Sequence, residues 1–403
     1  MSSVPRDIAI VGAGTAGAAS AHFLARAGHR VTLFERVADP MPIGAGLLLQ
    51  PSGLAVLAQL GLLGAALNRG ARIDRLYGQN QNGRVVMDMS YRDWQRADAH
   101  GLGIHRGALF DLLQQGLAAA GVTLRYGVEI TVQKSVADKT ELFDAAGVAH
   151  GAFDLVVIAD GMRSALREGT GIPVSVKPYA WGALWAICED TGDSVATLSQ
   201  RYRAATEMLG LLPTGSVMPG GKQLLSIFWS LPVADFPAWR KAGLSAWKKT
   251  VLALAPEYAP IIAQIHIAEQ VRFADYADVT MPQWHTDRAV VIGDAAHATS
   301  PQLGQGTNLA LVDAWALSRV LAASNNIAEA VTAYSDARRN HLAYYQRASH
   351  WLTPFFQSYL GSAPAVRDAL MGYTRHVPYL RRQFAATVAG TKSGLFSSAI
   401  SLP

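Results

Sequence analysis

The sequence predicts an α/β protein: a Rossmann-like dinucleotide-binding domain interleaved with a mainly antiparallel β-sheet domain, followed by a helical C-terminal segment. Three observations predict this class. A glycine-rich turn joins the first apolar strand to the first helix. Residues 173–280 interleave Trp, Tyr, Met and Phe among short strands. Beyond Asp313 the apolar spacing becomes helical.

These changes of pattern suggest domain boundaries. We expect the dinucleotide-binding domain to comprise residues 1–71, 101–172 and 281–325, the β-sheet domain residues 72–100 and 173–280, and the helical segment residues 326–403.

The first element is a strand at residues 7–11, followed by the glycine turn and a helix over residues 18–27. A second strand at residues 30–34 ends at Glu35. Glycines permit the tight turn, the approach of a pyrophosphate and helix packing, and an acid at the second strand's end can bind ribose hydroxyls. The stretch predicts a dinucleotide site made by Gly12, Gly14, Thr15, Ala16, Gly17, Glu35 and Arg36.

The middle of the N-terminal half contains a hairpin and several further strands. Residues 72–89 alternate around a turn at residues 81–84, which predicts a hairpin that opens the second domain. We expect strands at residues 122–132, 141–143 and 153–159 to return to the first sheet. The last of them ends at Asp160.

A second candidate ligand stretch lies far downstream. Residues 289–292 predict a buried strand that Gly293 and Asp294 end, so the carboxylate stands where ligands of open α/β sheets bind. Gly304 and Gly306 allow close backbone approach. The next residues start a helix whose free N–H groups favour negative charge, such as that of a reduced flavin. A strand, a turn and a capped helix without any ligand would give the same pattern.

Three motifs in this order resemble those of the single-component FAD-dependent aromatic hydroxylases. They are D-G-x-x-S-x-x-R at residues 160–167, G-D-A-A-H at 293–297 and P-x-x-G-x-G-x-N at 301–308. Thr15 and Arg163 are less usual occupants of the family's positions. The resemblance implies that FAD is the cofactor. It places Gly46, Arg106, Asp160, Gly293, Asp294 and Gly304 at the FAD, Pro301 beside the flavin ring, and the backbone of Gly306, Thr307 and Asn308 at the flavin edge.

The resemblance also implies a reaction. NADH or NADPH reduces FAD, molecular oxygen forms a flavin C4a-hydroperoxide, and an aromatic or polycyclic small molecule is hydroxylated. A prenyl-lipid reductase, an oxidase or a non-catalytic FAD-dependent binding protein would use the same scaffold. A halogenase fits less well, because Trp181 and Trp185 lack the spacing of the W-x-W-x-I-P signature.

The aromatic strands suggest where a substrate binds. Core packing is an alternative for each of the side chains that we expect to line the pocket, which are Gln50, Trp185, Met208, Phe228 and Trp229. For His297 a structural role at a helix end is favoured over that of a general base. No metal-ligand spacing is present.

Composition bounds the remaining possibilities. One cysteine in 403 residues excludes an internal disulfide, and no stretch has the length of a membrane span, so we expect a cytoplasmic protein. Residues 331–403 carry eight Lys and Arg against two Asp and Glu. These arginines are spaced along apolar sequence, which indicates a solvated helix face rather than nucleic-acid binding. Monomer and homodimer both remain open.

Overall fold

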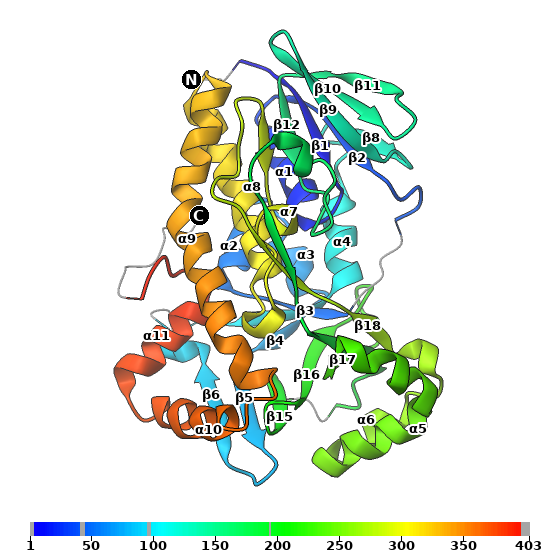
Figure 1. Cartoon of the computed structure of the whole chain (residues 1–403), viewed down its shortest axis with the longest axis vertical. Helices are drawn as coiled ribbons and strands as arrows, with labels where there is room; N and C mark the ends of the chain where they lie inside the picture. The colour runs from blue at the N-terminus through cyan, green and yellow to red at the C-terminus, as the bar shows by residue number, and fades with distance from the viewer. Residues whose placement is uncertain (1–3, 41–44, 95–97, 193–194, 396–403) are drawn as a thin grey trace.

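A computed structural model describes residues 4–40, 45–94, 98–192 and 195–395. A five-stranded parallel sheet forms its upper part (Figure 1). The strand order is β20 (Ala289–Val291), β12 (Leu155–Ile158), β1 (Asp7–Val11), β2 (Arg30–Glu35) and β8 (Thr123–Tyr126). The central strands are buried on both faces, as continuous apolar runs require.

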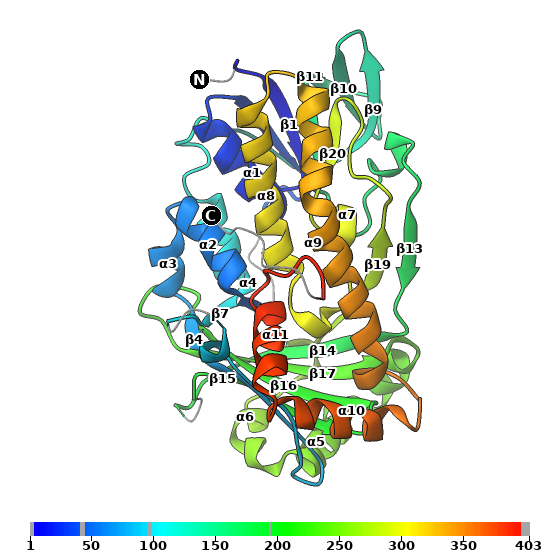
Figure 2. The ribbon, with the colours of Figure 1, turned by 90° about the vertical axis from the view of Figure 1, so that its left-hand side faces the viewer.

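Helices cover one face of this sheet and a β-meander covers the other (Figure 2). The helices are α1 (Thr15–Arg26), α4 (Arg106–Gln114) and α8 (Gly306–Ala323). The meander consists of β9 (Ile130–Val136), β10 (Lys139–Asp144) and β11 (Ala149–Phe153). The expectation that residues 122–132 and 141–143 return to the first sheet is therefore wrong in part. β8 joins the sheet, whereas β9 and β10 pair with each other because a short turn joins them.

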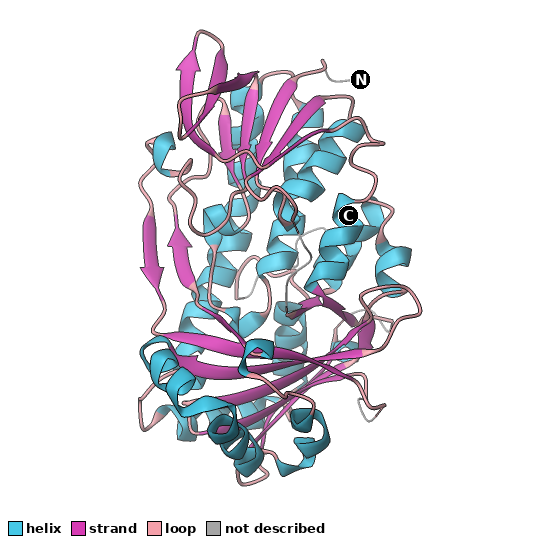
Figure 3. Cartoon of the chain, turned by 90° about the vertical axis from the view of Figure 1, so that its right-hand side faces the viewer, coloured by secondary structure: helices cyan, strands magenta, loops and turns pink. Residues whose placement is uncertain are grey.

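A seven-stranded sheet forms the lower part, and it is antiparallel except for one pair (Figure 3). Its order is β18 (Arg272–Ala274), β14 (Trp181–Glu189), β17 (Leu224–Pro232), β16 (Glu207–Gly215), β15 (Thr197–Arg203), β5 (Arg75–Asn80) and β6 (Val85–Ser90). Helices α5 (Phe236–Leu254) and α6 (Ala259–Ala263) pack against one face. The predicted α/β fold class with a mainly antiparallel second sheet is confirmed.

Smaller elements join the two sheets. A three-stranded antiparallel sheet packs against β16, and a Cβ atom at Gly103 would lie 1.9 Å from the carbonyl oxygen of Pro213. A two-stranded ribbon runs alongside. The three-stranded sheet has the order β3 (Gly46–Leu49), β7 (Gly101–His105) and β4 (Ala71–Ile73). The ribbon consists of β13 (Ser175–Pro178) and β19 (Ala277–Thr280). The helices α2 (Pro51–Gln59) and α3 (Leu63–Leu67) follow β3 in the chain.

The C-terminal segment is helical, as predicted. α9 (Ile327–Phe356) spans both parts of the molecule, and α10 (Ala363–Thr374) and α11 (Pro378–Val388) follow (Figure 1). α9 continues through Pro354, because a proline so close to the helix end removes few backbone hydrogen bonds. No helix in the described ranges is long and apolar enough to cross a membrane.

Candidate FAD and substrate site

The parallel sheet brings the predicted motifs to one edge. β1, β2, β12 and β20 run in one direction. Glu35 is the last residue of its strand, and Gly12, Asp160 and Gly293 follow the carboxyl ends of theirs, all at the same edge. The approach between the motifs is close. A Cβ atom at Gly12 would lie 2.4 Å from the carbonyl oxygen of Ala159, and one at Gly293 would lie 2.9 Å from the Cβ of Ala16.

The glycine turn leaves an open cradle at the start of α1. A Cβ atom at Gly17 would lie 1.9 Å from the carbonyl oxygen of Gly12, so Gly17 is required by the turn itself. Gly14 is exposed, and a Cβ atom there would contact no described atom within 4 Å. α1 has no side-chain cap and no acid in its first turn. Its free N–H groups therefore fit a pyrophosphate.

Three carboxylates stand around this cradle. Glu35 accepts hydrogen bonds from the amides of Ala13 (2.9 Å) and Val37 (3.0 Å), which hold the turn. Asp160 Oδ1 is buried without a hydrogen-bond partner among the described residues, and burial raises the pKa of Asp160. Asp294 is exposed at the start of α7 (Asp294–His297). An unsatisfied buried oxygen at a strand end fits a hydroxyl of the FAD chain.

The start of α8, like that of α1 and of most helices in the described chain, has no side-chain cap. Gly306 is its first residue, and no acid is among the residues of its first turn, although a Cβ atom at Gly306 would lie 3.7 Å from Asp294 Oδ1. Gly304, with φ of +59°, and Gly306 are exposed, while Thr307 is half-buried. Pro301 is exposed just before them. The N–H groups of this turn fit the negative edge of a reduced flavin.

Asn308 and Gln50 connect β3 and α2 to the start of α8. The side-chain oxygen of Asn308 accepts a hydrogen bond from the backbone N–H of Gln50 (2.8 Å). The side-chain NH2 group of Asn308 donates to the backbone carbonyls of Leu48 and Gly304 (both 3.1 Å). The Gln50 side-chain oxygen accepts a hydrogen bond from the buried Tyr91 hydroxyl. The side chains of Gln50 and Tyr91 are both buried, so this hydrogen bond fixes the position of the Gln50 side chain.

The other predicted FAD residues differ in setting. The Gly46 amide donates to Ser226 Oγ (2.6 Å), and a Cβ atom at Gly46 would lie 2.1 Å from Thr214 Cγ2, so packing against the large sheet explains this glycine. The Arg106 guanidinium is exposed at the start of α4 and makes no hydrogen bond or ion pair to a described residue. Arg36 is exposed, 3.8 Å from Glu129.

The predicted substrate residues divide between the two faces of the large sheet. Trp185 and Phe228 are opposite each other on β14 and β17, and both are half-buried on the face away from α5. Met208 is on the same face, but it packs toward Tyr202. Trp229 is only 4% exposed and packs in the core beneath α5. The inclusion of Trp229 in a pocket lining is therefore wrong, because side chains alternate along β17.

Comparison with known proteins identifies the family. The model of the FAD binding domain family matches residues 6–348. The chain belongs to this family. It is 29% identical over 321 residues to 6-methylpretetramide 4-monooxygenase of Streptomyces rimosus, covering 78% of this chain and 75% of that protein. It is 27% identical over 372 residues to 6-hydroxynicotinate 3-monooxygenase of Bordetella bronchiseptica, covering 87% and 93%.

A solved structure supports the same fold. Klebsiella pneumoniae HpxO complexed with FAD and uric acid has a TM-score of 0.81 at 18% sequence identity, covering 96% of this chain and 98% of that chain. The protein is an FAD-dependent monooxygenase of the aromatic hydroxylase type, and FAD is its cofactor. The uncapped starts of α1 and α8 and the unpaired Asp160 oxygen fit this cofactor.

In this FAD-dependent hydroxylase a buried polar network supports the Gly293 turn. Asp313 accepts hydrogen bonds from the Gly293 amide (2.9 Å), His297 Nε2 (2.6 Å) and Arg338 Nε (2.7 Å). Burial alone would raise the pKa of Asp313, but His297 and Arg338 outweigh burial and lower it. His297 thus contributes a hydrogen bond to this buried network.

The network reaches the C-terminal segment. Arg338 donates to His341 Nδ1, so His341 Nε2 donates to the carbonyl of Gly390 (3.0 Å). The prediction that the C-terminal arginines lie on a solvated face is wrong for Arg338 and Arg367, which are at most 2% exposed, and the sequence pattern did not predict this network. The one available signal was Asp313, a lone acid within the apolar run 309–317.

His341 is expected to make the fold acid-sensitive. Burial, together with Arg338, lowers the pKa of His341 from its ordinary 6.5 to about 3. As the pH falls, the unfolded chain takes up a proton below about pH 6.5, whereas the folded protein resists protonation until about pH 3. The free energy of unfolding should therefore fall across this window by on the order of 4 kcal/mol.

Urea denaturation at a series of pH values measures this effect. His341→Gln keeps an acceptor for Arg338 and a donor for Gly390, so it should flatten the acid slope. His376→Gln, which removes an exposed histidine, should leave the slope unchanged. An unchanged slope in His341→Gln would contradict the assignment.

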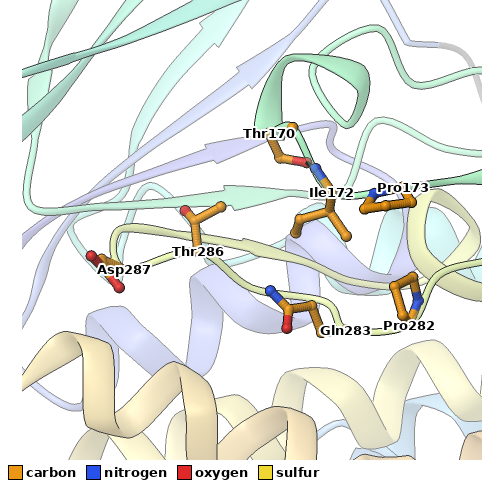
Figure 4. Close-up of a pocket in the computed structure, with 8 residues that line it drawn as sticks. Thr170, Ile172, Pro173, Pro282, Gln283, Thr286 and Asp287 are labelled. Atoms are coloured by element: carbon orange, nitrogen blue, oxygen red, sulfur yellow. Dashed lines mark hydrogen bonds between the residues drawn. The ribbon is translucent and has the colours of Figure 1, made fainter.

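A separate pocket of about 450 Å³ opens beside the ribbon β13–β19 (Figure 4). It includes none of the predicted cofactor or substrate residues. Its lining residues are Thr170, Gly171, Ile172, Pro173, Pro282, Gln283, Thr286 and Asp287. We assign no ligand to this pocket, since its lining contributes one ionisable side chain, that of Asp287.

Proposed function

We propose that the hydroxylase binds a planar aromatic substrate against Trp185 and Phe228, on the face of the seven-stranded sheet that α5 leaves free. One observation carries this proposal. The two rings are direct cross-strand neighbours and half-buried, and Gly210 on β16 stands opposite Phe228. A Cβ atom at Gly210 would lie 3.8 Å from Phe228, so the glycine leaves space beside the ring. Aromatic side chains favour a planar aromatic ligand by stacking.

The position of this face relative to the FAD edge supports the proposal. Ser226 is on the same face of β17 as Phe228, and its hydroxyl accepts from the amide of Gly46 at the start of β3. Asn308 in turn fixes β3 and α2 to the first turns of α8. Rigid contacts therefore connect the aromatic pair to the helix start that would face the flavin. Such contacts fix the distance between substrate and cofactor.

The cofactor supplies the redox chemistry, and the protein binds and positions the cofactor. FAD supplies the redox chemistry, accepting a hydride from NADH or NADPH and activating molecular oxygen. We propose that the start of α1 holds the pyrophosphate, that Glu35, Asp160, Asp294 and Arg106 bind the remaining polar groups of FAD, and that the start of α8 stabilises negative charge on the flavin. Pro301, anchored through its neighbour Ser300 to Ser349 and Thr353 (both 2.9 Å), would form a wall beside the ring.

Trp185 and Trp229 provide a matched pair of substitutions. Trp185→Leu is expected to raise the KM for the aromatic substrate about tenfold, through lost stacking, with little change in Tm. Trp229→Leu should lower Tm by several degrees, because it leaves a cavity beneath α5. Steady-state kinetics and thermal melts distinguish the two. An unchanged KM in Trp185→Leu would place the substrate elsewhere.

The decisive experiment follows flavin absorbance under anaerobic conditions. NADH and NADPH are each added to the holoprotein, with and without a panel of phenols, indoles, quinolones and polyketides. We expect one nucleotide to bleach the flavin and a panel member to accelerate the bleaching. If neither nucleotide reduces the flavin, the proposal of direct reduction by NADH or NADPH fails, and a partner reductase must supply the electrons.

We also propose a cytoplasmic location, where NADH and NADPH are available. The one cysteine supports this. Cys188 is buried, and burial raises its pKa to about 11, so it packs as a small apolar side chain.

A further inference from the structure

The outward face of α10 is apolar. Val366, Leu370 and Tyr373 are 40%, 62% and 65% exposed, and their spacing of four and three residues places them on one side of the helix. The other exposed residues of this helix are Ala365 and Ala369. The outward face of α10 therefore carries no charge. This is the reverse of an ordinary surface helix.

Buried polar contacts fix this orientation. Arg367, 1% exposed, donates to the carbonyls of Ala204 (2.8 Å) and Phe355 (3.2 Å), and its guanidinium lies 4.8 Å from the centre of the Tyr202 ring. Asp368 pairs with Arg367 and accepts from the Asn80 amide group (2.7 Å). Turning the helix over would bury its apolar face but leave these groups unpaired, which costs more.

Further apolar side chains flank α10 on both sides. Tyr359 and Leu360 precede it and are 73% and 60% exposed, and Tyr379 and Leu380 follow it at 54% and 39%. α10 lies at the end of the molecule away from the parallel sheet and runs across the direction of α9 (Figures 1 and 2). Its apolar face is therefore available to a surface that approaches this end. Seven exposed apolar side chains within one segment mark an interaction site.

The charges around this face select its partner. Asp368 is the only acid among residues 350–395, and it is turned inward. Arg381 and Arg382 are exposed at the start of α11; Arg381 pairs with Asp93 (2.7 Å), whereas Arg382 makes no ion pair with a described residue. The region of the α10 face thus offers an unpaired cation, Arg382, and no unpaired acid of residues 350–395, so it complements an anionic partner better than a second copy of itself. An anionic surface with an apolar layer beneath it satisfies both features.

We propose that the α10 face, defined by Val366, Leu370 and Tyr373 with the flanking Tyr359, Leu360, Tyr379 and Leu380, binds the surface of an anionic lipid bilayer. Tyr and Leu side chains enter the headgroup and acyl boundary, and the Arg382 guanidinium contacts lipid phosphates. In an isolated amphipathic membrane helix the polar side faces water, whereas the polar side of α10 contacts other parts of the protein. A few short side chains give reversible rather than permanent attachment.

The test is co-sedimentation of the FAD-loaded protein with vesicles. We expect it to bind vesicles of phosphatidylcholine with phosphatidylglycerol, to bind pure phosphatidylcholine far less, and to dissociate as salt is raised. Leu370→Gln should lower the partition coefficient about tenfold. Leu67→Gln on α3, where Leu67 is also exposed at 42%, is the matched control and should bind like the wild type.

Three results would overturn the proposal. They are no vesicle binding by the wild type, equal binding to both vesicle types, or unchanged binding by Leu370→Gln. Light scattering measures whether a second copy of the protein occupies the α10 face instead. A stable dimer that Leu370→Gln dissociates, without vesicle binding, would assign the α10 face to a second copy. Melting curves and FAD content verify that each variant is folded, so a loss of binding reports on the face alone.

Discussion

Gly14→Val is expected to weaken FAD binding by about a hundredfold or more and to leave the folded apoprotein nearly as stable as the wild type. The backbone at Gly14 has φ of −66° and ψ of −174°, which valine adopts without strain. A Cβ atom there contacts no described atom within 4 Å, so the turn itself accepts the side chain. The side chain would instead fill the space in front of the N–H groups of α1, where we propose that the FAD pyrophosphate binds.

Gly17→Ala is the matched control. Its Cβ atom would lie 1.9 Å from the carbonyl oxygen of Gly12, and backbone atoms have no room to move there. This variant should therefore lose apoprotein stability as well as FAD affinity. FAD titration by fluorescence quenching and thermal melts of the apoproteins measure the two quantities separately. Wild-type FAD affinity in Gly14→Val would mean that the cofactor does not cross the start of α1.

The contrast between these glycines shows what sequence can predict. Gly12, Gly14 and Gly17 were assigned together, because the strand, turn and helix around them have a strong local pattern. The carboxyl ends of parallel strands meet at one edge, so Asp160 and Asp294 could be placed by the strands that precede them. The sequence could not show which glycine serves the fold and which leaves space for a ligand, because this depends on atoms brought near by folding.

The proposed substrate face shows a second limit of sequence-based prediction. Alternation along β14 and β17 predicts that Trp185 and Trp229 belong to half-buried strands. The face that becomes core is decided by α5, which packs over Trp229 and leaves Phe228 on the other side. That helix contact lies outside the strands, and no local pattern reports it. The same applies to Arg367, whose buried partners Ala204 and Phe355 come from other elements.

Arg338→Leu is expected to lower the free energy of unfolding by about 3–5 kcal/mol, since it leaves the Asp313 carboxylate buried without its cation. Arg338 and Asp313 are 2% and 0% exposed, so water cannot replace the lost partner. Arg339→Leu removes the same charge from a side chain that is 52% exposed and should change stability by less than about 0.5 kcal/mol. Urea denaturation at neutral pH compares the two variants.

The double variant Arg338→Leu with Asp313→Leu distinguishes an unpaired charge from a lost contact. If the unpaired carboxylate causes the loss, removing it should restore part of the stability that Arg338→Leu costs. Full additivity of the two substitutions would contradict this and would mean that His297 alone compensates Asp313. Because Asp313 also holds the Gly293 amide, we expect the double variant to bind FAD more weakly than Arg339→Leu even where its fold recovers. The buried ion pair would then serve the position of the Gly293 turn more than the stability of the core.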